Sequence, residues 1–322
     1  MVSELASLSE LVTIRDFLRF AVSRFRAAEL SYGHGTVTAL DDAAFLILET
    51  LHLPIDNLEP WLDARLTRAE RTLLTGVIED RVVTRKPSAY LTHSAYIGPH
   101  RFFVDGRVIV PRSFIGELLC TDDGAALDLA HEPERVLDLC TGSGCLAIVA
   151  AHRFAQAHVI AVDVSRAALE VAKENVKRHG LAARVQLQEG DLFAALGGSR
   201  FDLILCNPPY VTNAAVASFP AEYKAEPVLA HSGGTDGMDL VRRVIDTAGD
   251  HLAPDGVLVM EVGQGRDILE RDYPGLPFLW LDTELSVGEV CKLEAADVQT
   301  ASPRPQRRGK SRAAGEKAAR RS

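Results

Sequence analysis

The four residues Asn207 to Tyr210, with the sequence NPPY, place an amide, two prolines and a phenol directly after the apolar run FDLILC. Two consecutive prolines lock φ and remove two backbone N–H donors, so this turn offers carbonyls and side chains to a ligand. The apolar run has the length and composition of a buried strand. Because ligands bind at the carboxyl ends of strands in open α/β sheets, we expect NPPY to face a crevice.

A planar NH2 group is the chemistry that suits this turn. The nitrogen of an amide or aromatic amine is a poor nucleophile because its lone pair is delocalised, and a site that binds it needs acceptors for two N–H hydrogens. The side-chain oxygen of Asn207 and the carbonyl of Pro208 can be those acceptors and can support charge building on the nitrogen. Tyr210 can pack against the planar face. The alternative is a rigid Pro-Pro turn in which Asn207 caps a neighbouring element.

A glycine-rich turn follows an earlier apolar strand. The stretch DLCTGSGCLAI puts Asp138 at the carboxyl end of that strand and Gly142 and Gly144 before an expected helix. The pattern Gly142-x-Gly144-x-x-Ala147 has the spacing of a dinucleotide fingerprint. Glycines let the backbone approach a ligand closely, and a helix N-terminus adds oriented N–H groups. Asp163 ends the next strand, where an acid accepts hydrogen bonds from a ribose diol. The pattern predicts a nucleotide-like cofactor, with a purely structural tight turn as the alternative.

Two carboxylates separate the candidate cofactors. Asp138 lies four residues before Gly142 and is expected to point into the crevice, where it repels a pyrophosphate and suits the ammonium of an amino-acid moiety. S-adenosylmethionine carries that ammonium and no phosphate, so it is favoured over NAD. After the third strand, Asp191 can accept from the exocyclic amine of adenine while Leu192 packs on the ring. A helix N-cap is the alternative role for Asp191.

The elements that must position these strand ends are typical of an α/β fold. Short apolar strands alternate with helical segments, which predicts a doubly wound, mostly parallel sheet. We expect seven strands, at residues 135–139, 158–164, 184–188, 201–206 and 257–263, with two more within 278–295.

A small helical domain is expected before the sheet, in residues 1–92, because apolar residues there recur at intervals of three and four. Thr67 and Glu70 have the spacing of a capping box. Two β-rich runs flank Asp105-Gly106, which predicts a β-hairpin linker over 93–111 with its turn at that dipeptide. The sheet domain is then expected over 112–302.

Charge divides the chain into two parts. Residues 303–322 hold 8 Lys/Arg and 1 acidic residue, a net charge of +7, whereas residues 1–302 hold 27 and 43, a net charge of −16. The acidic body is expected to repel nucleic acid and to attract a basic protein. We expect the basic tail to be disordered, and it either contacts RNA or is solvated without a role.

Composition excludes several classes of protein. The chain has no run of 18 apolar residues, which argues against a membrane span, and its first residues do not read as a secretory signal. The five cysteines are odd in number and form no C-x-x-C pair, and the ten histidines are scattered without ligand spacing. We therefore expect a cytoplasmic protein without disulfides and without a metal site.

The stretches DLCTGSG, AVD, GDLF and NPPY together resemble the class I S-adenosylmethionine-dependent methyltransferases that modify planar NH2 groups. That set includes DNA enzymes and the protein glutamine methyltransferases, and the acidic body and the helical domain favour the glutamine enzymes. Within these, residues 8–296 are more similar to the members that act on large-subunit ribosomal protein L-three, through stretches such as TIRDFLRFAVSRF, KPSAYLT and GGTDGMDLVRR. Members that act on release factors typically have PRPxTE where this chain has PRSFIGE.

The resemblance implies transfer of a methyl group from S-adenosylmethionine to a glutamine side-chain amide of that ribosomal protein, during ribosome assembly. It also implies that residues 1–92 recognise the substrate and that residues 112–302 form the methyltransferase domain. Asn207, Pro208 and Tyr210 are the expected catalytic residues, and together with Pro209 they are expected to hold the glutamine. The expected cofactor-binding residues are Asp138, Thr141, Gly142, Gly144, Asp163, Asp191, Leu192 and Asn207.

Other functions stay open at this point. A release factor is the second candidate substrate, and a nucleic-acid amino-group methyltransferase is the third reading, against which the acidic body argues because phosphate binding needs clustered Lys and Arg. An NAD(P)-dependent oxidoreductase would put a pyrophosphate beside Asp138 and gives NPPY no role. The stretches AHSGG around His231 and GEVCKL depart from the pattern of the family.

Overall fold

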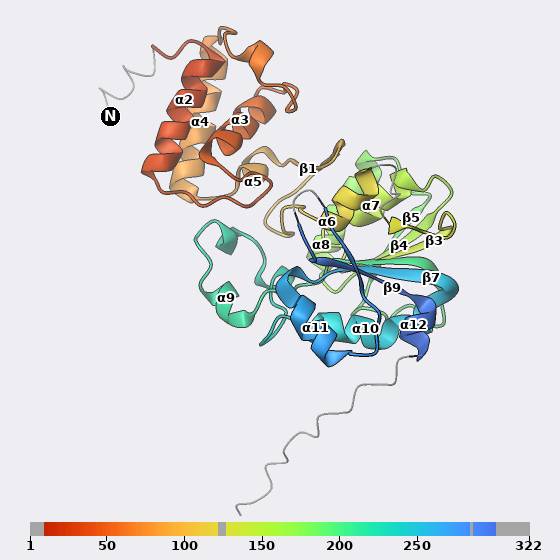
Figure 1. Cartoon of the computed structure of the whole chain (residues 1–322). Helices are drawn as coiled ribbons and strands as arrows, with labels where there is room; N and C mark the ends of the chain where they lie inside the picture. Colours follow the sequence, from red (N-terminus) through yellow and green to blue (C-terminus); the bar gives the residue numbers. More distant parts are fainter. Residues whose placement is uncertain (1–9, 122–126, 284–285, 301–322) are drawn as a thin grey trace, which may run out of the picture.

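A helical bundle and a larger sheet domain, joined by a linker, make up the chain in this computed structural model, which describes residues 10–121, 127–283 and 286–300. Figure 1 shows the bundle beside a sheet that has helices on both faces. No helix within these described ranges is long and apolar enough to cross a membrane. The predicted basic tail, residues 303–322, lies outside them.

The helical bundle buries the apolar stripes of its helices against one another. The predicted capping box is confirmed, because the Thr67 hydroxyl accepts from the backbone N–H of Glu70 and the Glu70 carboxylate accepts from that of Thr67. Phe17 and Phe25 are fully buried in its core. The elements of the bundle are α2 (Ile14–Ala27), α3 (Ala39–Thr50), the 3-10 turn η1 (Glu59–Trp61), α4 (Arg68–Thr84) and α5 (Ser88–Thr92).

Seven strands form the sheet in the order β5-β4-β3-β6-β7-β9-β8. The strands from β5 to β7 run parallel, whereas β9 is antiparallel to both of its neighbours. The prediction of a mostly parallel, seven-stranded α/β sheet is therefore confirmed. The strands are β3 (Arg135–Leu139), β4 (His158–Asp163), β5 (Val185–Glu189), β6 (Phe201–Cys206), β7 (Leu252–Glu261), β8 (Leu279–Leu281) and β9 (Val290–Glu294).

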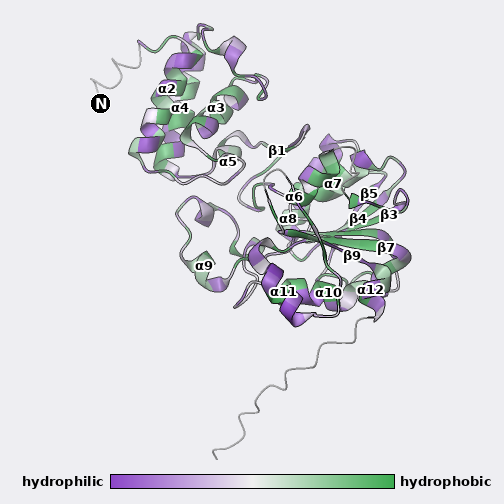
Figure 2. Cartoon of the chain, in the orientation of Figure 1, coloured by the Kyte–Doolittle hydropathy of each residue, from purple (hydrophilic) through white to green (hydrophobic). Residues whose placement is uncertain are grey.

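Helices cover the two faces of the sheet, because side chains along each central strand alternate between two cores. In β6, Leu203 and Leu205 belong to one apolar cluster, and Ile204 and Cys206 belong to the other. Figure 2 shows the hydrophobic colour concentrated along these central strands. The helices of the first face are α6 (Phe114–Cys120), α7 (Cys145–Arg153) and α8 (Arg166–Arg178), and those of the second are α10 (Asp239–His251), α11 (Arg266–Asp272) and α12 (Ala295–Thr300).

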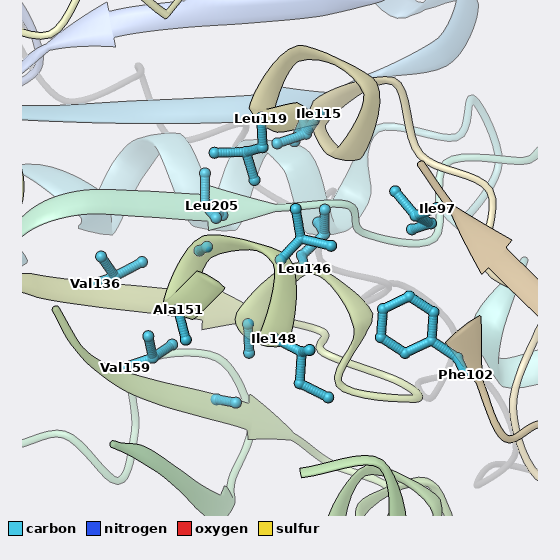
Figure 3. Packing of buried hydrophobic residues seen from close by; sticks show 14 of the residues in the cluster. Ile97, Phe102, Ile115, Leu119, Val136, Leu146, Ile148, Ala151, Val159 and Leu205 are labelled. Atoms are coloured by element: carbon cyan, nitrogen blue, oxygen red, sulfur yellow. The ribbon is translucent and has the colours of Figure 1, made fainter. Parts of the chain in front are cut away.

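The linker hairpin packs on the first face, but its turn is not where the sequence predicts it. Strands β1 (Ala95–Ile97) and β2 (His100–Phe102) pair so that Ile97 lies opposite His100, which puts the turn at Gly98-Pro99. Figure 3 shows Ile97 and Phe102 pointing toward α7 in the shared core.

The prediction of a hairpin turn at Asp105-Gly106 is wrong, because the backbone after that dipeptide bonds to side chains and not to a second strand. The Asp105 carboxylate accepts from the backbone and guanidinium of Arg107. The carbonyl of Val108 accepts from the buried hydroxyl of Tyr90, and the N–H of Val110 donates to Glu226. These bonds satisfy the groups that a partner strand would need.

Strands β3 and β6 are neighbours whose connections leave toward opposite faces of the sheet. The helix after β3, α7, lies on the first face, and α10, which follows β6, lies on the second. Such a reversal is a topological switch point, where a crevice opens at the carboxyl ends of the strands. The glycine-rich turn follows β3 and NPPY follows β6, so the fold brings the two motifs to the same place.

Candidate active site

A cavity opens at this switch point, and we call it the strand-end cavity. It encloses about 770 Å³ including its open mouth. Its walls come from the ends of β3, β4, β5 and β6, from Arg107–Ile109 of the linker, and from the segment that contains η4 (Val228–Ala230). Sequence reasoning did not assign the last two walls to the site, because nothing in their local pattern indicates that they fold over the strand ends.

The glycine-rich turn closes against the end of β4. Gly142 has φ +55° and lines the cavity, and its N–H donates to the Asp163 carboxylate at 2.8 Å. Gly144, with φ +80°, does not line the cavity; a Cβ there would lie 3.1 Å from that of Ala172 in α8. Gly142 lets a ligand in the cavity come close to the backbone. Gly144 is needed because its backbone is left-handed and because a side chain there would crowd α8.

Asp163 lies on the wall of the cavity at the end of β4. One carboxylate oxygen accepts from Gly142 and the other from the N–H of Ser165, at 2.8 Å each. A carboxylate has about four lone-pair sites, so each oxygen retains capacity for a ligand hydroxyl. Burial raises the pKa of Asp163 despite these bonds.

Asp138 does not point into the cavity as the sequence suggested. Its side chain is fully buried behind the turn, where one oxygen accepts from the Thr141 hydroxyl at 2.5 Å and from the N–H of Ala147 at 3.0 Å. Thr141 is buried as well and does not line the cavity. The other oxygen of Asp138 has no hydrogen-bond partner, and burial raises the pKa of this carboxyl to about 7.

Asp191 and Leu192 follow β5 and both line the cavity. The Asp191 carboxylate forms an exposed ion pair with Arg243 at 2.8 Å, and it caps no regular helix. Leu192 is buried and has φ +52°, a left-handed backbone conformation. The side chain of Leu192 therefore contributes an apolar surface beside a carboxylate.

Asn207 and Pro209 of NPPY line the same cavity, whereas Pro208 and Tyr210 do not. The NH2 group of Asn207 donates to the carbonyl of Arg112 at 3.5 Å, a long and weak bond that leaves its side-chain oxygen available as an acceptor.

Tyr210 packs against the protein rather than at the cavity wall. A Cβ on Gly263 would lie 2.8 Å from its ring, and burial raises the pKa of its hydroxyl.

The loop that carries Gly233 fits closely on the backbone of NPPY: a Cβ on this glycine would lie 2.6 Å from the carbonyl of Pro209. The N–H of Gly233 donates to the carbonyl of Val211 at 2.8 Å. The stretch HSGGTDGM thus supports the turn from behind.

A buried carboxylate, Glu226, organises the next layer, which we call the Glu226 junction: Glu226 with His34, Val110, Arg112 and His231. The guanidinium of Arg112 donates two bonds of 2.8 Å to Glu226, and the N–H of Val110 donates a third of 2.8 Å. The imidazole nitrogens of His231 and His34 lie 3.0 and 3.5 Å away. Burial alone would raise the pKa of Glu226, but Arg112 and the imidazoles hold it well below its usual range.

The Glu226 junction connects the helical bundle, the linker and the cavity. His34 comes from the bundle, and the carbonyl of Arg112 accepts the weak bond from Asn207. Nearby, buried Glu222 accepts from the N–H of Ser31 at 3.1 Å and pairs with Arg85 of the bundle at 2.7 Å. The segment between β6 and α10 is thus tied to the bundle on one side and borders the cavity on the other.

Comparisons with known proteins show what the chain is similar to. The family described as "Methyltransferase small domain" matches residues 121–222. A protein of Bradyrhizobium diazoefficiens named "Ribosomal protein uL3 glutamine methyltransferase" is 54% identical over 295 residues, which are 90% of this chain and 92% of that protein. A protein of Bordetella pertussis with the same name is 51% identical over 294 residues, covering 90% and 98%. Among solved structures, TrmN from Thermus thermophilus matches with 23% identity and a TM-score of 0.40, over 53% of this chain and 47% of that chain.

Proposed function

The chain belongs to the family of ribosomal protein uL3 glutamine methyltransferases, and we propose that it methylates the side-chain amide nitrogen of a glutamine in uL3. The methyl donor is S-adenosylmethionine. The observation that carries the proposal is that Gly142 and Asp163, on the cofactor side, line one cavity with Asn207 and Pro209. A cofactor at the first pair would bring its reactive group to the second.

The residues of the strand-end cavity fit S-adenosylmethionine. Gly142 lets the backbone approach a ligand, Asp163 has lone pairs for the ribose hydroxyls, and Leu192 supplies an apolar surface for adenine. The oxygen of Asp138 that lacks a partner is a buried acceptor behind the turn and outside the cavity wall, so an ammonium would reach it only if the turn moves. Because the acids Asp163 and Asp191 line the cavity, a pyrophosphate would be repelled.

When bound, the cofactor supplies a methyl group on a positively charged sulfur. Transfer would join this methyl group to the glutamine nitrogen, which would give up one proton, so the task of the protein is to hold the amide in line with the carbon–sulfur bond. We assign to the Asn207 side-chain oxygen, on the cavity wall, the task of accepting one N–H of the amide, which aligns the nitrogen for in-line transfer. The carbonyl of Pro208, the next residue of the turn but outside the cavity wall, is the second acceptor that we propose. The bond from Asn207 to the Arg112 carbonyl supports this role, because it turns the oxygen of the amide toward the substrate.

Tyr210 has a supporting role in this proposal. Its ring packs beside Gly263 and the neighbouring apolar cluster, so it holds the NPPY turn in place. Pro209, which lines the cavity, offers the nearest apolar surface to the amide plane.

We assign recognition of uL3 to residues 1–92 together with the rim of the cavity. Val228 and Leu229 of η4 are 63% and 60% exposed, so an apolar rim faces solvent beside the cavity. The segment that carries them is tied to the bundle through Glu222 and Arg85. The net charge of −16 over residues 1–302 favours a basic protein partner and, with the family, a cytoplasmic location.

The test is methylation of purified uL3 in the presence of S-adenosylmethionine, followed by mass spectrometry of its peptides. We expect one methyl group on one glutamine with the wild-type enzyme and none with Asn207→Ala. Asn213→Ala, which changes an asparagine of α9 (Asn213–Ala217) outside the cavity, is the matched control and should keep the activity. Methylation of a peptide chain release factor in place of uL3 would refute the assigned substrate while leaving the chemistry intact.

A further inference from the structure

Three histidines that lie far apart in the sequence meet on the surface of the sheet domain. His100 begins β2, His152 lies in the last turn of α7, and His179 caps the C-terminus of α8. Nε2 of His152 lies 3.1 Å from Nδ1 of His179, and one ring nitrogen of each histidine lies within 4.8 Å of those of the other two. The rings of His100 and His152 stack with centroids 4.7 Å apart.

The position of the cluster favours a cation. Both α7 and α8 end at these histidines, and the C-terminal ends of helices carry partial negative charge. Nε2 of His179 lies 2.9 Å from the carbonyl of Arg101. A carbonyl accepts only, so His179 donates from Nε2 and presents the lone pair of Nδ1 to His152. Histidines that ligate metals nearly always have such an outer partner, which orients the ring.

The charges around the cluster leave it available to a metal ion. Arg184 is a cation near His152, and its guanidinium donates to two backbone carbonyls at 3.2 Å. Arg101 forms an ion pair with Glu49 at 2.7 Å, and this carboxylate compensates the charge of Arg101.

We propose that His100, His152 and His179 bind a divalent transition metal ion, with zinc as the expected ion, and that this ion clamps the linker hairpin to the ends of α7 and α8. Imidazole is a favoured ligand of zinc, at Zn–N distances of about 2.0–2.1 Å. These distances place neighbouring ligands of a tetrahedral site about 3.3 Å apart, close to the 3.1 Å between His152 and His179. Lone pairs lie in the ring planes, so binding requires the stacked rings to turn, and the exposed side chain of His152 has room to do so.

The clamp would act on the segment that reaches the active site. Directly after β2, the N–H and carbonyl of Phe103 bond to the side chain of buried Asn175 in α8, at 2.7 and 3.0 Å. Asn175 also donates to the carbonyl of Ser143 in the glycine-rich turn, at 2.9 Å. A few residues later, Arg107–Ile109 line the strand-end cavity. A metal ion at His100 therefore anchors the start of a segment whose other end is a wall of the cavity.

The first test measures metal binding by the full-length protein without an affinity tag, in the absence of cofactor and substrate. Titration with zinc should show one equivalent bound with a dissociation constant in the micromolar range or lower. Binding by His152→Gln should be weaker by more than the roughly 10–100-fold that loss of an outer partner costs. His158→Gln, a change of another exposed histidine, is the matched control and should bind as the wild type does. Absence of a stoichiometric site in the wild type, or equal binding by His152→Gln, would overturn the proposal.

The second test asks whether the ion clamps the hairpin. Zinc should raise the Tm of the wild type and of His158→Gln in a concentration-dependent way, and should leave the Tm of His152→Gln and His100→Gln unchanged. Cobalt in place of zinc should give the visible d–d absorption of a four-coordinate site in the wild type and in His158→Gln, but not in His152→Gln or His100→Gln. A Tm that does not respond to zinc would refute the clamp. Neither readout involves methyl transfer, so failure here is separate from failure of the proposed function.

Discussion

Asp138 and Glu226 are both buried carboxylates near the active site, and they differ in what compensates their charge. Glu226 accepts from the guanidinium of Arg112 and from the backbone N–H of Val110, and two imidazole nitrogens lie 3.0 and 3.5 Å away. Together these groups hold its pKa well below the usual range. Among the described residues Asp138 has no cation beside it and one of its oxygens has no hydrogen-bond partner, and burial raises its pKa to about 7. The protein itself therefore compensates the charge of Glu226, whereas it does not compensate that of Asp138.

The difference separates an acid whose charge the protein itself compensates from one that still lacks a counterion. A buried charge with its own counterion joins elements of the chain, and removing it leaves the counterion uncompensated. A buried acid without a counterion destabilises the fold at neutral pH unless a ligand supplies the missing charge. Four experiments test this contrast and the roles assigned to the residues of the cavity.

The largest effect is expected from Glu226→Gln. It should lower the free energy of unfolding by about 3 kcal/mol at pH 7, because Arg112 and the two imidazoles lose their buried anion. Denaturation with urea measures the loss, and Glu189→Gln, an exposed glutamate at the end of β5, is the control. Since the pKa of Glu226 is depressed in the folded state, its stabilisation is present above its unfolded pKa and should fade as the pH falls below about 4. A loss no larger than that of the control would remove the structural role of the junction.

Asn207→Ala should lower methyl transfer by about 100-fold or more, because the amide nitrogen of the substrate loses a positioned acceptor. Binding of S-adenosylhomocysteine, measured by calorimetry, should stay within a factor of a few of the wild type. Retained turnover would contradict the assigned role of Asn207, and loss of cofactor binding would move Asn207 from the substrate side to the cofactor side.

Asp163→Ala should weaken cofactor binding by about 10- to 100-fold, the cost of losing hydrogen bonds to a charged acceptor. Asp191→Ala, at the other carboxylate of the cavity wall, should have a smaller effect, because Asp191 is exposed and already paired with Arg243. Calorimetric titration of both variants with S-adenosylmethionine distinguishes the two. Equal losses would mean that the exposed Asp191 matters as much as the partly buried Asp163.

The smallest effect is a pH dependence that belongs to Asp138. Its pKa of about 7 means that the acid is mostly protonated at pH 6 and half ionised at pH 7. If an ammonium binds the ionised form, affinity for S-adenosylmethionine should rise about fivefold between pH 6 and pH 7, while the α-amino group of the ligand stays protonated. Asp138→Asn should bind with nearly constant affinity over that range. The same slope in both proteins would assign the pH dependence to another group, such as Glu261, whose pKa burial also raises to about 7.

The sequence predicted the strand ends well because the signals for them are local. The apolar run before Asn207 and the glycines after β3 each act within a few residues, and the carboxyl ends of parallel strands necessarily share one edge of the sheet. The capping box of Thr67 and Glu70 is local for the same reason. From these signals alone, Gly142, Asp163 and Asn207 could be placed together.

The direction of buried side chains could not be predicted in the same way. Asp138 was expected in the crevice, but the hydroxyl of Thr141 and the N-terminus of α7 hold it behind the turn. The hairpin turn was expected at Asp105-Gly106, where the dipeptide signal is strong. The turn forms at Gly98-Pro99 instead. The backbone groups of Val108 and Val110, which would have paired in the second strand, form hydrogen bonds with the side chains of Tyr90 and Glu226.

The sequence by itself thus determined the order of strands and helices, the cofactor turn and the acceptor-rich NPPY turn, because each depends on neighbours in the chain. Only the tertiary structure decided which distant groups meet. His34, Arg112, Glu226 and His231 form one junction, and His100, His152 and His179 form one cluster, although no spacing in the sequence relates them. Hydrogen bonds and ligand geometry act over about 3 Å, so such sites exist only where packing brings separate elements together.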